Sequence, residues 1–205
     1  AGNYTLTINE NAFADNAGNK NAAQTFSFTP FAKTVPTVSA SNIEVTVGSS
    51  VAPNVEYDGD GTATYSGHES IATFADGKFT GTKVGTATVT VTVSETDNYE
   101  AGSATFTLTV SKGAVTLSAT EIAVQEGSTI SAGVTAKDAS EKAVEGLTYT
   151  YSSADESVAS VDANGKITGN KIGSTTITVT FAGNDNYNSA SVEITVTVTK
   201  KDAGV

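Results

Sequence analysis

The stretch GKITGNKIGSTTITVTF, residues 165–181, guides the interpretation of the whole chain. Its glycines, Gly165, Gly169 and Gly173, lie four residues apart, and threonines then alternate with large apolar residues. A Walker phosphate-binding loop needs four residues between its glycines, followed by Gly-Lys-Ser/Thr, and here the spacing is three. A GxxxG membrane-helix face needs an apolar segment of about 20 residues, which the Lys and Asn of this stretch exclude. The glycines are therefore interpreted as residues at the ends of β-strands, with Asn164-Gly165 as a hairpin turn.

The same pattern occurs earlier, in GKFTGTKVGTATVTVTV at residues 77–93. Each copy is followed by Asp-Asn-Tyr, at residues 97–99 and 185–187, which is an offset of 88 residues. Farther upstream the offset falls to 79, and most of the difference is assigned to an insertion in the second copy, TAKDASEKAVEG at residues 135–146. Two copies of roughly 75 to 90 residues predict two similar domains, joined near Lys112-Gly113.

Both copies have the period-two alternation of strands that bury one face. The side chains predicted to be buried are Ala87, Val89, Val91, Val93, Phe106, Leu108 and Val110 in the first copy, and Ile177, Val179, Phe181, Ile194, Val196 and Val198 in the second. Polar, turn-forming segments separate these strands, and no segment has a convincing helical period. About seven short strands per copy predict an all-β fold of two-sheet sandwiches.

The composition excludes several classes of function. The 205 residues carry a formal net charge of −11, which disfavours nucleic acid and anionic membranes as partners. The absence of cysteine excludes disulfides and thiolate chemistry. No apolar run approaches the roughly 20 residues of a membrane-spanning helix. The first residues, AGNY, contain neither an initiator Met nor a signal peptide, so we expect a piece of something longer.

The second copy resembles the bacterial Ig-like group 2 domain of intimin- and invasin-type surface proteins. The resemblance rests on Tyr151-Ser152-Ser153, residues 158–161, residues 164–169 and residues 173–177, and the first copy carries a poorer version at residues 71–74, 76–81 and 85–89. It implies tandem immunoglobulin-like β-sandwiches that serve as spacers or adhesive stalks. Members of this family usually have Trp where Tyr65 and Tyr151 stand, so both tyrosines are expected to be buried in the cores.

Residues 1–36 align with neither copy. Tyr4, Leu6 and Ile8 alternate with polar residues, as do Phe26 and Phe28, and this resembles the last two strands of another type of bacterial Ig-like domain. An isolated hairpin is marginally stable in water. The segment is therefore expected either to pack on a neighbouring domain or to pair with another chain. The predicted organisation is a truncated Ig-like hairpin at 1–36, Ig-like domains at 37–112 and 113–200, and a linker at 201–205.

Residues that could carry chemistry are few. The only histidine, His68, has no serine-hydrolase motif with it and is interpreted as a solvated loop residue. Zinc needs three or four ligands, so one histidine does not suggest a zinc site. No catalytic, cofactor-binding or metal-ligating residue is therefore assigned, and no cofactor is expected.

Calcium is a minor hypothesis. EYDGDGTATYSGHE places Glu56, Asp58, Asp60 and Gly61 at spacing like that of an EF-hand loop, but Gly67 stands where the closing Glu is needed. A tight Asp-Gly turn is the favoured interpretation, and residues 15–19, DNAGN, are also interpreted as a turn. Asp97 and Asp185 are further candidates near a domain junction.

Sugar binding needs exposed aromatic side chains. The candidates are Tyr57, Tyr65, Tyr99, Tyr149, Tyr151 and Tyr187. Tyr99 and Tyr187 recur in the same loop of the two copies, which favours a shared structural role as corner residues whose hydroxyl groups bond to the backbone.

The favoured function is a non-catalytic structural or adhesive spacer of a secreted or cell-surface bacterial protein, with an extracellular location. Its partner would be a surface protein or glycan, and chains could pair through residues 1–36. The alternative is an accessory carbohydrate-binding module of a polysaccharide-degrading enzyme.

Overall fold

A computed structural model describes residues 3–201, and these residues form strands β1–β20 and no helix. This confirms the predicted all-β class. Among the same residues there is accordingly no helix long and apolar enough to cross a membrane. Residues 202–205 of the predicted linker lie outside the described part of the chain.

The chain forms two compact units. One comprises residues up to Ser39 together with 56–64 and 91–104, and the other comprises residues 40–55, 65–90 and those from 105 onward. The predicted boundaries at 36/37 and 112/113 follow the sequence repeat instead and remain predictions.

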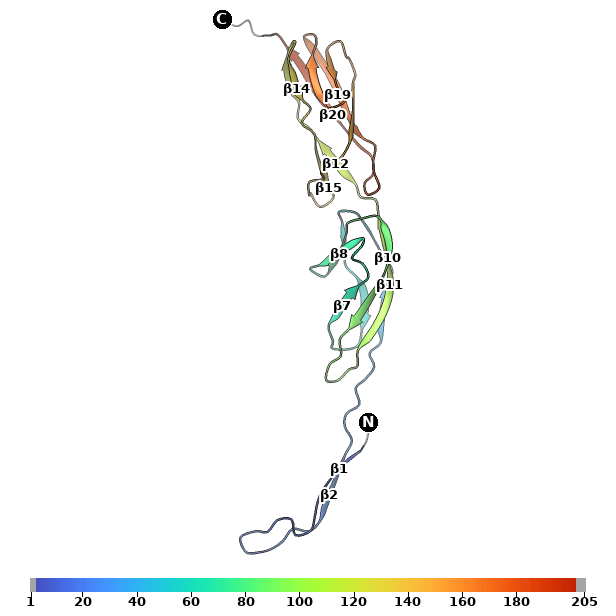
Figure 1. Ribbon diagram of the computed structural model, residues 1–205, viewed down its shortest axis with the longest axis vertical. Helices are drawn as coiled ribbons and strands as arrows, with labels where there is room; N and C mark the ends of the chain where they lie inside the picture. The colour runs from blue at the N-terminus through green and yellow to red at the C-terminus, as the bar shows by residue number, and fades with distance from the viewer. Residues whose placement is uncertain (1–2, 202–205) are drawn as a thin grey trace. The chain divides into compact units, whose positions relative to one another are not determined.

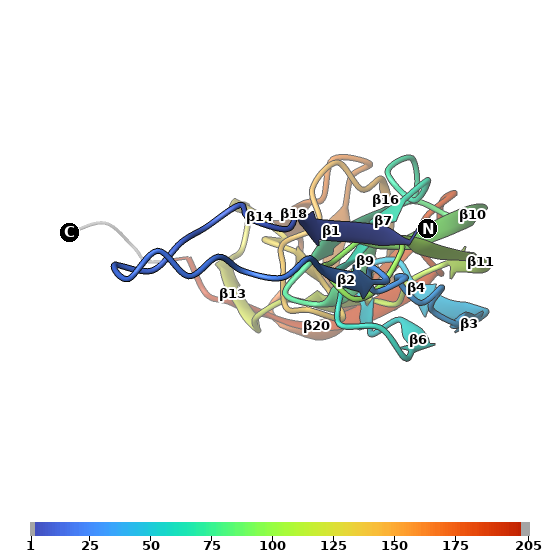
Figure 2. The same cartoon turned by 90° about the horizontal axis from the view of Figure 1, so that it is seen from below.

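The N-terminal segment forms one hairpin. Strand β1 (Tyr4–Ile8) pairs antiparallel with β2 (Gln24–Phe28), and the two strands lie side by side in Figure 2. Leu6 lies opposite Phe26 and Tyr4 opposite Phe28, whose rings stack with centroids 5.8 Å apart. The side chains of Tyr4, Leu6, Phe26 and Phe28 are each 50–58% exposed. The apolar face of the hairpin is therefore exposed, and its packing on a neighbouring domain or on another chain stays a prediction.

The first copy contains strands β3–β11. Their bounds are β3 Val38–Ser41, β4 Ile43–Thr46, β5 Ser50–Val51, β6 Asn54–Tyr57, β7 Ala63–Ser66, β8 Ala72–Ala75, β9 Lys78–Gly81, β10 Gly85–Val93 and β11 Gly102–Ser111. They form sheets in the orders β4-β11-β10-β7, β5-β9-β8 and β3-β6. Figure 1 shows the long strands β10 and β11 of the first of these sheets side by side.

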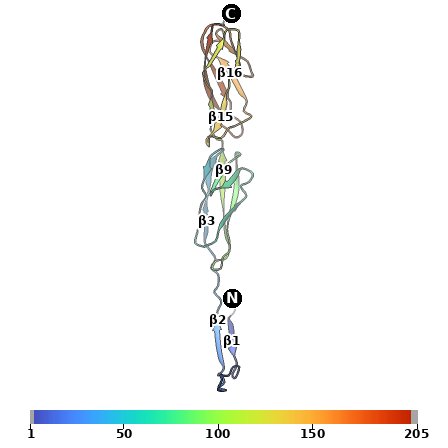
Figure 3. The ribbon, with the colours of Figure 1, turned by 90° about the vertical axis from the view of Figure 1, so that its left-hand side faces the viewer.

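The second copy contains strands β12–β20. Their bounds are β12 Val115–Ser118, β13 Ile122–Gln125, β14 Thr129–Ser131, β15 Thr135–Asp138, β16 Tyr149–Ser153, β17 Ala159–Val161, β18 Lys166–Gly169, β19 Gly173–Phe181 and β20 Ala190–Thr199 (Figure 3). The sheet orders are β13-β20-β19-β16, β14-β18-β17 and β12-β15. Adding nine to each strand number of the first copy reproduces these orders, so the sequence repeat is also a repeat of topology.

The insertion is shorter than the sequence suggested. Its first four residues form β15, which pairs with β12 as β6 pairs with β3 in the first copy. The added residues begin after Asp138 and fold back on β15, because Asp138 N–H donates to the Lys142 carbonyl and Val144 N–H to the Ala136 carbonyl. The added residues therefore form a small turn at the end of β15, a strand whose equivalent in the first copy is β6.

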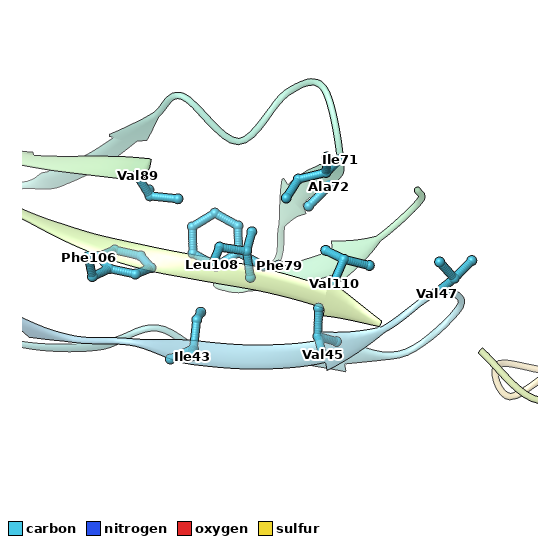
Figure 4. Close-up of a cluster of buried hydrophobic side chains, with 10 residues drawn as sticks. All are labelled: Ile43, Val45, Val47, Ile71, Ala72, Phe79, Val89, Phe106, Leu108 and Val110. Carbon is cyan, nitrogen blue, oxygen red and sulfur yellow. The ribbon is translucent and has the colours of Figure 1, made fainter. Parts of the chain in front are cut away.

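The two cores form as the alternation predicted. In the first copy Phe79, Leu108 and Val89 are fully buried, and Figure 4 shows the Phe79 ring beside Leu108 in the middle of the cluster. In the second copy Ile167, Ile177 and Val196 are equally buried. The predicted inward residues of β10, β11, β19 and β20 are buried except for Ala87, which is partly buried.

Two core predictions need correction. Tyr65 and Tyr151 were expected to be buried, but each is only partly buried at the side of its core. Tyr65 lies against the rings of Phe74 and Phe79, and of these three rings only that of Phe79 is fully buried. Tyr151 pairs with Val179 across strands β16 and β19, and β16 is an edge strand of its sheet, so solvent reaches one side of the ring.

Candidate functional site

The two Asp-Asn-Tyr loops hold the chain where it enters each copy. In the first copy Thr34 N–H donates to the Asn98 carbonyl and Glu100 N–H donates to the Thr34 carbonyl, both at 2.9 Å. In the second copy Gly113 N–H donates to the Asn186 carbonyl and Asn188 N–H to the Gly113 carbonyl, again at 2.9 Å. The same pair of main-chain hydrogen bonds, called the main-chain clamp below, therefore occurs in both copies.

The side chain that orders each loop lies two residues before its Asn. Thr96 Oγ1 accepts hydrogen bonds from the N–H groups of Asn98 and Tyr99, and Asn184 Oδ1 accepts from the N–H groups of Asn186 and Tyr187. The expected hydrogen bonds from the tyrosine hydroxyls to the backbone do not occur among residues 3–201, and main-chain groups make the clamp. The side chains of Asp97 and Asp185 are exposed.

In the second compact unit, the Asn186 loop also contacts the end of the first copy. Val84 N–H donates to Asn186 Oδ1 at 3.1 Å, and the Tyr187 ring packs against the first hydrophobic core. A Cβ atom at Gly113 would lie 2.2 Å from the Val47 carbonyl oxygen, so only glycine allows this approach.

Asp138 completes this contact from the start of the added turn. Its carboxylate Oδ1 accepts hydrogen bonds from Ser140 N–H, Ser140 Oγ and Lys142 N–H at 2.7–3.1 Å. Burial raises the pKa of the carboxyl group, but the hydrogen bonds from Ser140 and Lys142 together outweigh burial and hold the pKa below its ordinary value. The pKa of the Tyr187 hydroxyl is raised, first by burial and then by the charge of Asp138.

The acidic residues proposed for calcium are used in hydrogen bonds within the chain. Asp58 Oδ1 accepts from Thr37 N–H at 2.7 Å, and Asp60 Oδ1 accepts from Thr96 Oγ1 at 2.5 Å. The hydrogen bond from Thr96 is the main reason that the pKa of Asp60 is lowered. Asp15 accepts hydrogen bonds from the N–H groups of Ala17 and Asn19, as an Asx-turn does. Within residues 3–201 no three His, Cys, Asp or Glu side chains gather closely enough to hold a metal ion.

The second copy combines the parallel pair β13-β20, the β17-β18 hairpin with its turn at Gly165, and the main-chain clamp at Gly113. Residues 112–188 match the family model of the bacterial Ig-like domain (group 2). The resemblance noted in the sequence is thereby confirmed for the second copy, while membership of the first copy in the same family remains a prediction. No curated protein matches the chain.

Several solved structures are similar at low sequence identity. The insect immune protein hemolin is 13% identical with a TM-score of 0.45, over 96% of this chain and 56% of that chain. Domains 4 and 5 of the S-layer protein SbsC are 19% identical with a TM-score of 0.37, over 97% of this chain and 98% of that chain. Drosophila N-cadherin EC1-4 is 14% identical with a TM-score of 0.36, over 97% of this chain and 58% of that chain.

The prediction for His68 was wrong. His68 is buried in the first copy, and its ring lies edge-on to Phe79 with centroids 5.1 Å apart. Its Nδ1 atom has no hydrogen-bond partner within residues 3–201, and the nearest carboxylate oxygen, of Glu69, lies 3.8 Å away. In the second copy the equivalent residue, Asp155, is exposed and accepts hydrogen bonds from Ser157. Sequence inspection missed the burial because the aromatic residues that surround His68 follow it in later strands.

The tyrosines do not form one sugar platform. Tyr57 is exposed beside Thr37 and Glu56 in the first copy. Tyr149, in the second copy, lines a pocket of about 470 Å³ together with Leu147 and residues of the added turn. The pKa of Tyr149 is raised, first by burial and then by the neighbouring Tyr151 and Glu145.

Proposed function

We propose that this chain is a non-catalytic structural and adhesive spacer of a secreted or cell-surface bacterial protein. The observation that carries the proposal is the parallel pairing of an early strand with the last strand in each copy. Residues Ile43–Thr46 pair with Leu108–Ser111, and Ile122–Gln125 pair with Val196–Thr199.

This pairing suits a module that is stretched from its two ends. In a parallel pair, the chain enters one strand at one end of the ladder and leaves the other strand at the opposite end. Tension between the two ends therefore loads several inter-strand hydrogen bonds together in shear, rather than opening them one after another. Resistance to unfolding under force is the property that a spacer at a cell surface needs.

The chemical groups support the same proposal. The only histidine of the chain is buried among aromatic rings, and Asp58 and Asp60 accept hydrogen bonds from neighbouring residues. A nucleophile activated by an oriented base, which acyl-transfer enzymes require, is not found among the described residues. A surface protein or a glycan remains the proposed partner, and an extracellular location the proposed setting.

Stretching single molecules of the intact chain tests the spacer function. We expect two separate unfolding events, one for each sandwich, because each copy has its own parallel terminal pair. Extension without a resolved unfolding event would overturn the proposal.

A pull-down with soluble and insoluble polysaccharides tests the alternative, an accessory carbohydrate-binding module. We expect no retention of the intact chain. Retention that is lost in Tyr149→Ala and kept in Tyr57→Ala would instead assign sugar binding to the pocket beside the added turn.

A further inference from the structure

The two copies end in loops with the same backbone structure. Gly48 N–H donates to the Gly81 carbonyl at 2.9 Å, and Gly127 N–H donates to the Gly169 carbonyl at 2.8 Å. Return hydrogen bonds of 3.1 Å run from Gly81 N–H to the Ser49 carbonyl and from Gly169 N–H to the Ser128 carbonyl. Gly48 and Gly127 have φ values of +81° and +76°. The two ends are therefore a matched pair, and differences between them reflect what lies against each.

Only the Gly48 end is covered. A Cβ atom at Gly48 would lie 2.9 Å from Cβ of Asp138, whereas no atom of residues 3–201 lies within 4 Å of the same position at Gly127. Gly48 is buried and Gly127 is exposed. Val84 N–H donates to Asn186 Oδ1, but its equivalent, Ile172, has no such partner among the described residues, and its side chain is 54% exposed.

The opposite ends of the copies also differ, although both carry the Asp-Asn-Tyr loop. In the first copy the Asn98 amide points back to its own domain, where Nδ2 donates to Asp60 Oδ2 at 3.4 Å. In the second copy the added turn replaces the short segment that carries Asp60, and Asn186 Oδ1 accepts from Val84 instead. The added turn also begins at Asp138, the residue that lies against Gly48.

We propose that the second sandwich carries a docking surface for the end of a preceding sandwich of the same type, made by Gly113, Asp138, Asn186 and Tyr187. The partner must present a glycine with positive φ to Asp138, a carbonyl oxygen to Gly113 and an unpaired N–H to Asn186. The first copy meets all three requirements with Gly48, the Val47 carbonyl and the Val84 N–H. The insertion and the loop therefore recognise the neighbouring module and hold it, whereas the first copy, in which Asp60 engages Asn98, lacks this surface.

Amide hydrogen exchange in the intact chain tests the docking directly. Val84 N–H is bonded across the contact, whereas Ile172 N–H has no such bond within the described residues. We therefore expect Val84 N–H to exchange about tenfold more slowly than Ile172 N–H, after each rate is normalised to core amides of its own sandwich. Asn186→Ala should abolish this difference, and the matched variant Asn98→Ala should leave it unchanged. Equal exchange of the two amides in the unmodified chain would overturn the proposal.

The two matched glycines give an independent test. Gly48→Ala and Gly127→Ala introduce the same backbone strain, but only the first places a methyl group against Asp138. We expect Gly48→Ala to reduce the protection of Val84 N–H, and Gly127→Ala to leave it unchanged. Adding Asp138→Gly to Gly48→Ala, which also removes the Cβ atom of residue 138, should relieve the clash with the methyl group and restore part of the protection. Equal effects of the two glycine variants on Val84 would contradict docking at Gly48.

Discussion

The phenol ring of Tyr151 lies directly on Gly165. A Cβ atom at residue 165 would come within 2.6 Å of Cζ and 2.7 Å of the hydroxyl oxygen of Tyr151. Gly165 also has a φ of +74°, which suits the β17-β18 turn. The absence of a side chain at the same residue leaves room for the Tyr151 ring. The equivalent turn residue of the first copy, Gly77, has a φ of +72°, and none of the described residues has an atom within 4 Å of its Cβ position.

Replacement of Gly165 by alanine should destabilise the second sandwich more than Gly77→Ala destabilises the first. Both changes put a side chain in the left-handed region, which costs about 1–2 kcal/mol. Only Gly165→Ala also forces the Tyr151 ring to move. Urea unfolding of the two variants gives the comparison, and equal losses of stability would show that the ring adapts without cost.

His68→Phe should stabilise the first sandwich. The buried Nδ1 atom lacks a partner among the described residues, and an unsatisfied buried polar atom costs about 1–3 kcal/mol. A phenyl ring can take the same place against Phe79 without that cost. Thermal unfolding measures the gain. A variant less stable than the natural chain would mean that the imidazole makes a hydrogen bond to water in solution.

Asp138→Asn should lower stability at neutral pH by about 1 kcal/mol, because the charged acceptor of three hydrogen bonds is lost. The folded-state pKa of Asp138 is lowered, so its stabilising effect is present above the unfolded pKa of about 3.9 and is lost as the pH falls through the folded value. The difference between variant and natural chain should therefore be constant above about pH 5 and shrink below pH 4. Unfolding free energies measured from pH 3 to 7 provide the check, and a difference that does not change with pH would show that charge plays no part.

Calcium should stabilise the chain only as a general electrolyte. The formal charge of −11 produces self-repulsion that any salt screens, while Asp58 and Asp60 are already engaged by Thr37 and Thr96. Millimolar calcium should thus raise the melting temperature no more than sodium at equal ionic strength. A saturable rise that Asp60→Asn removes would instead indicate a bound ion.

The N-terminal hairpin should gain protection by pairing between chains. Its four apolar side chains are exposed in the hairpin, and each is worth roughly 1.5–3 kcal/mol when fully buried. Limited proteolysis should trim a dilute sample to about residue 36 and become slower as the protein concentration rises. Phe26→Ser should remove this concentration dependence, and Thr25→Ser, one residue away on the other face, should not. A trimming rate that is the same at every concentration would exclude pairing.

Local patterns predicted most of the fold because strand alternation and turn glycines depend on near neighbours in the chain. The inward residues of β19, Ile177, Val179 and Phe181, could be identified from their spacing, and so could the turn at Gly165. His68 could not be placed in this way, since Phe74 and Phe79 surround it only after β8 and β9 pair. For the same reason the bonding partners of Asp58 and Asp60, Thr37 and Thr96, were not visible in the loop that contains the two carboxylates.

The amino-acid sequence thus determines the class of fold, the repeat and the ends of most strands, because the period of two and the left-handed turns are properties of short segments. Which polar groups are satisfied, and by which partners, depends on residues far apart in the chain. Asn98 and Asn186 occupy the same place in the repeat, yet one donates to Asp60 within its own copy and the other accepts from Val84 of the preceding copy. Packing in three dimensions separates them, because the added turn after Asp138 replaces the segment that holds Asn98 in the first copy.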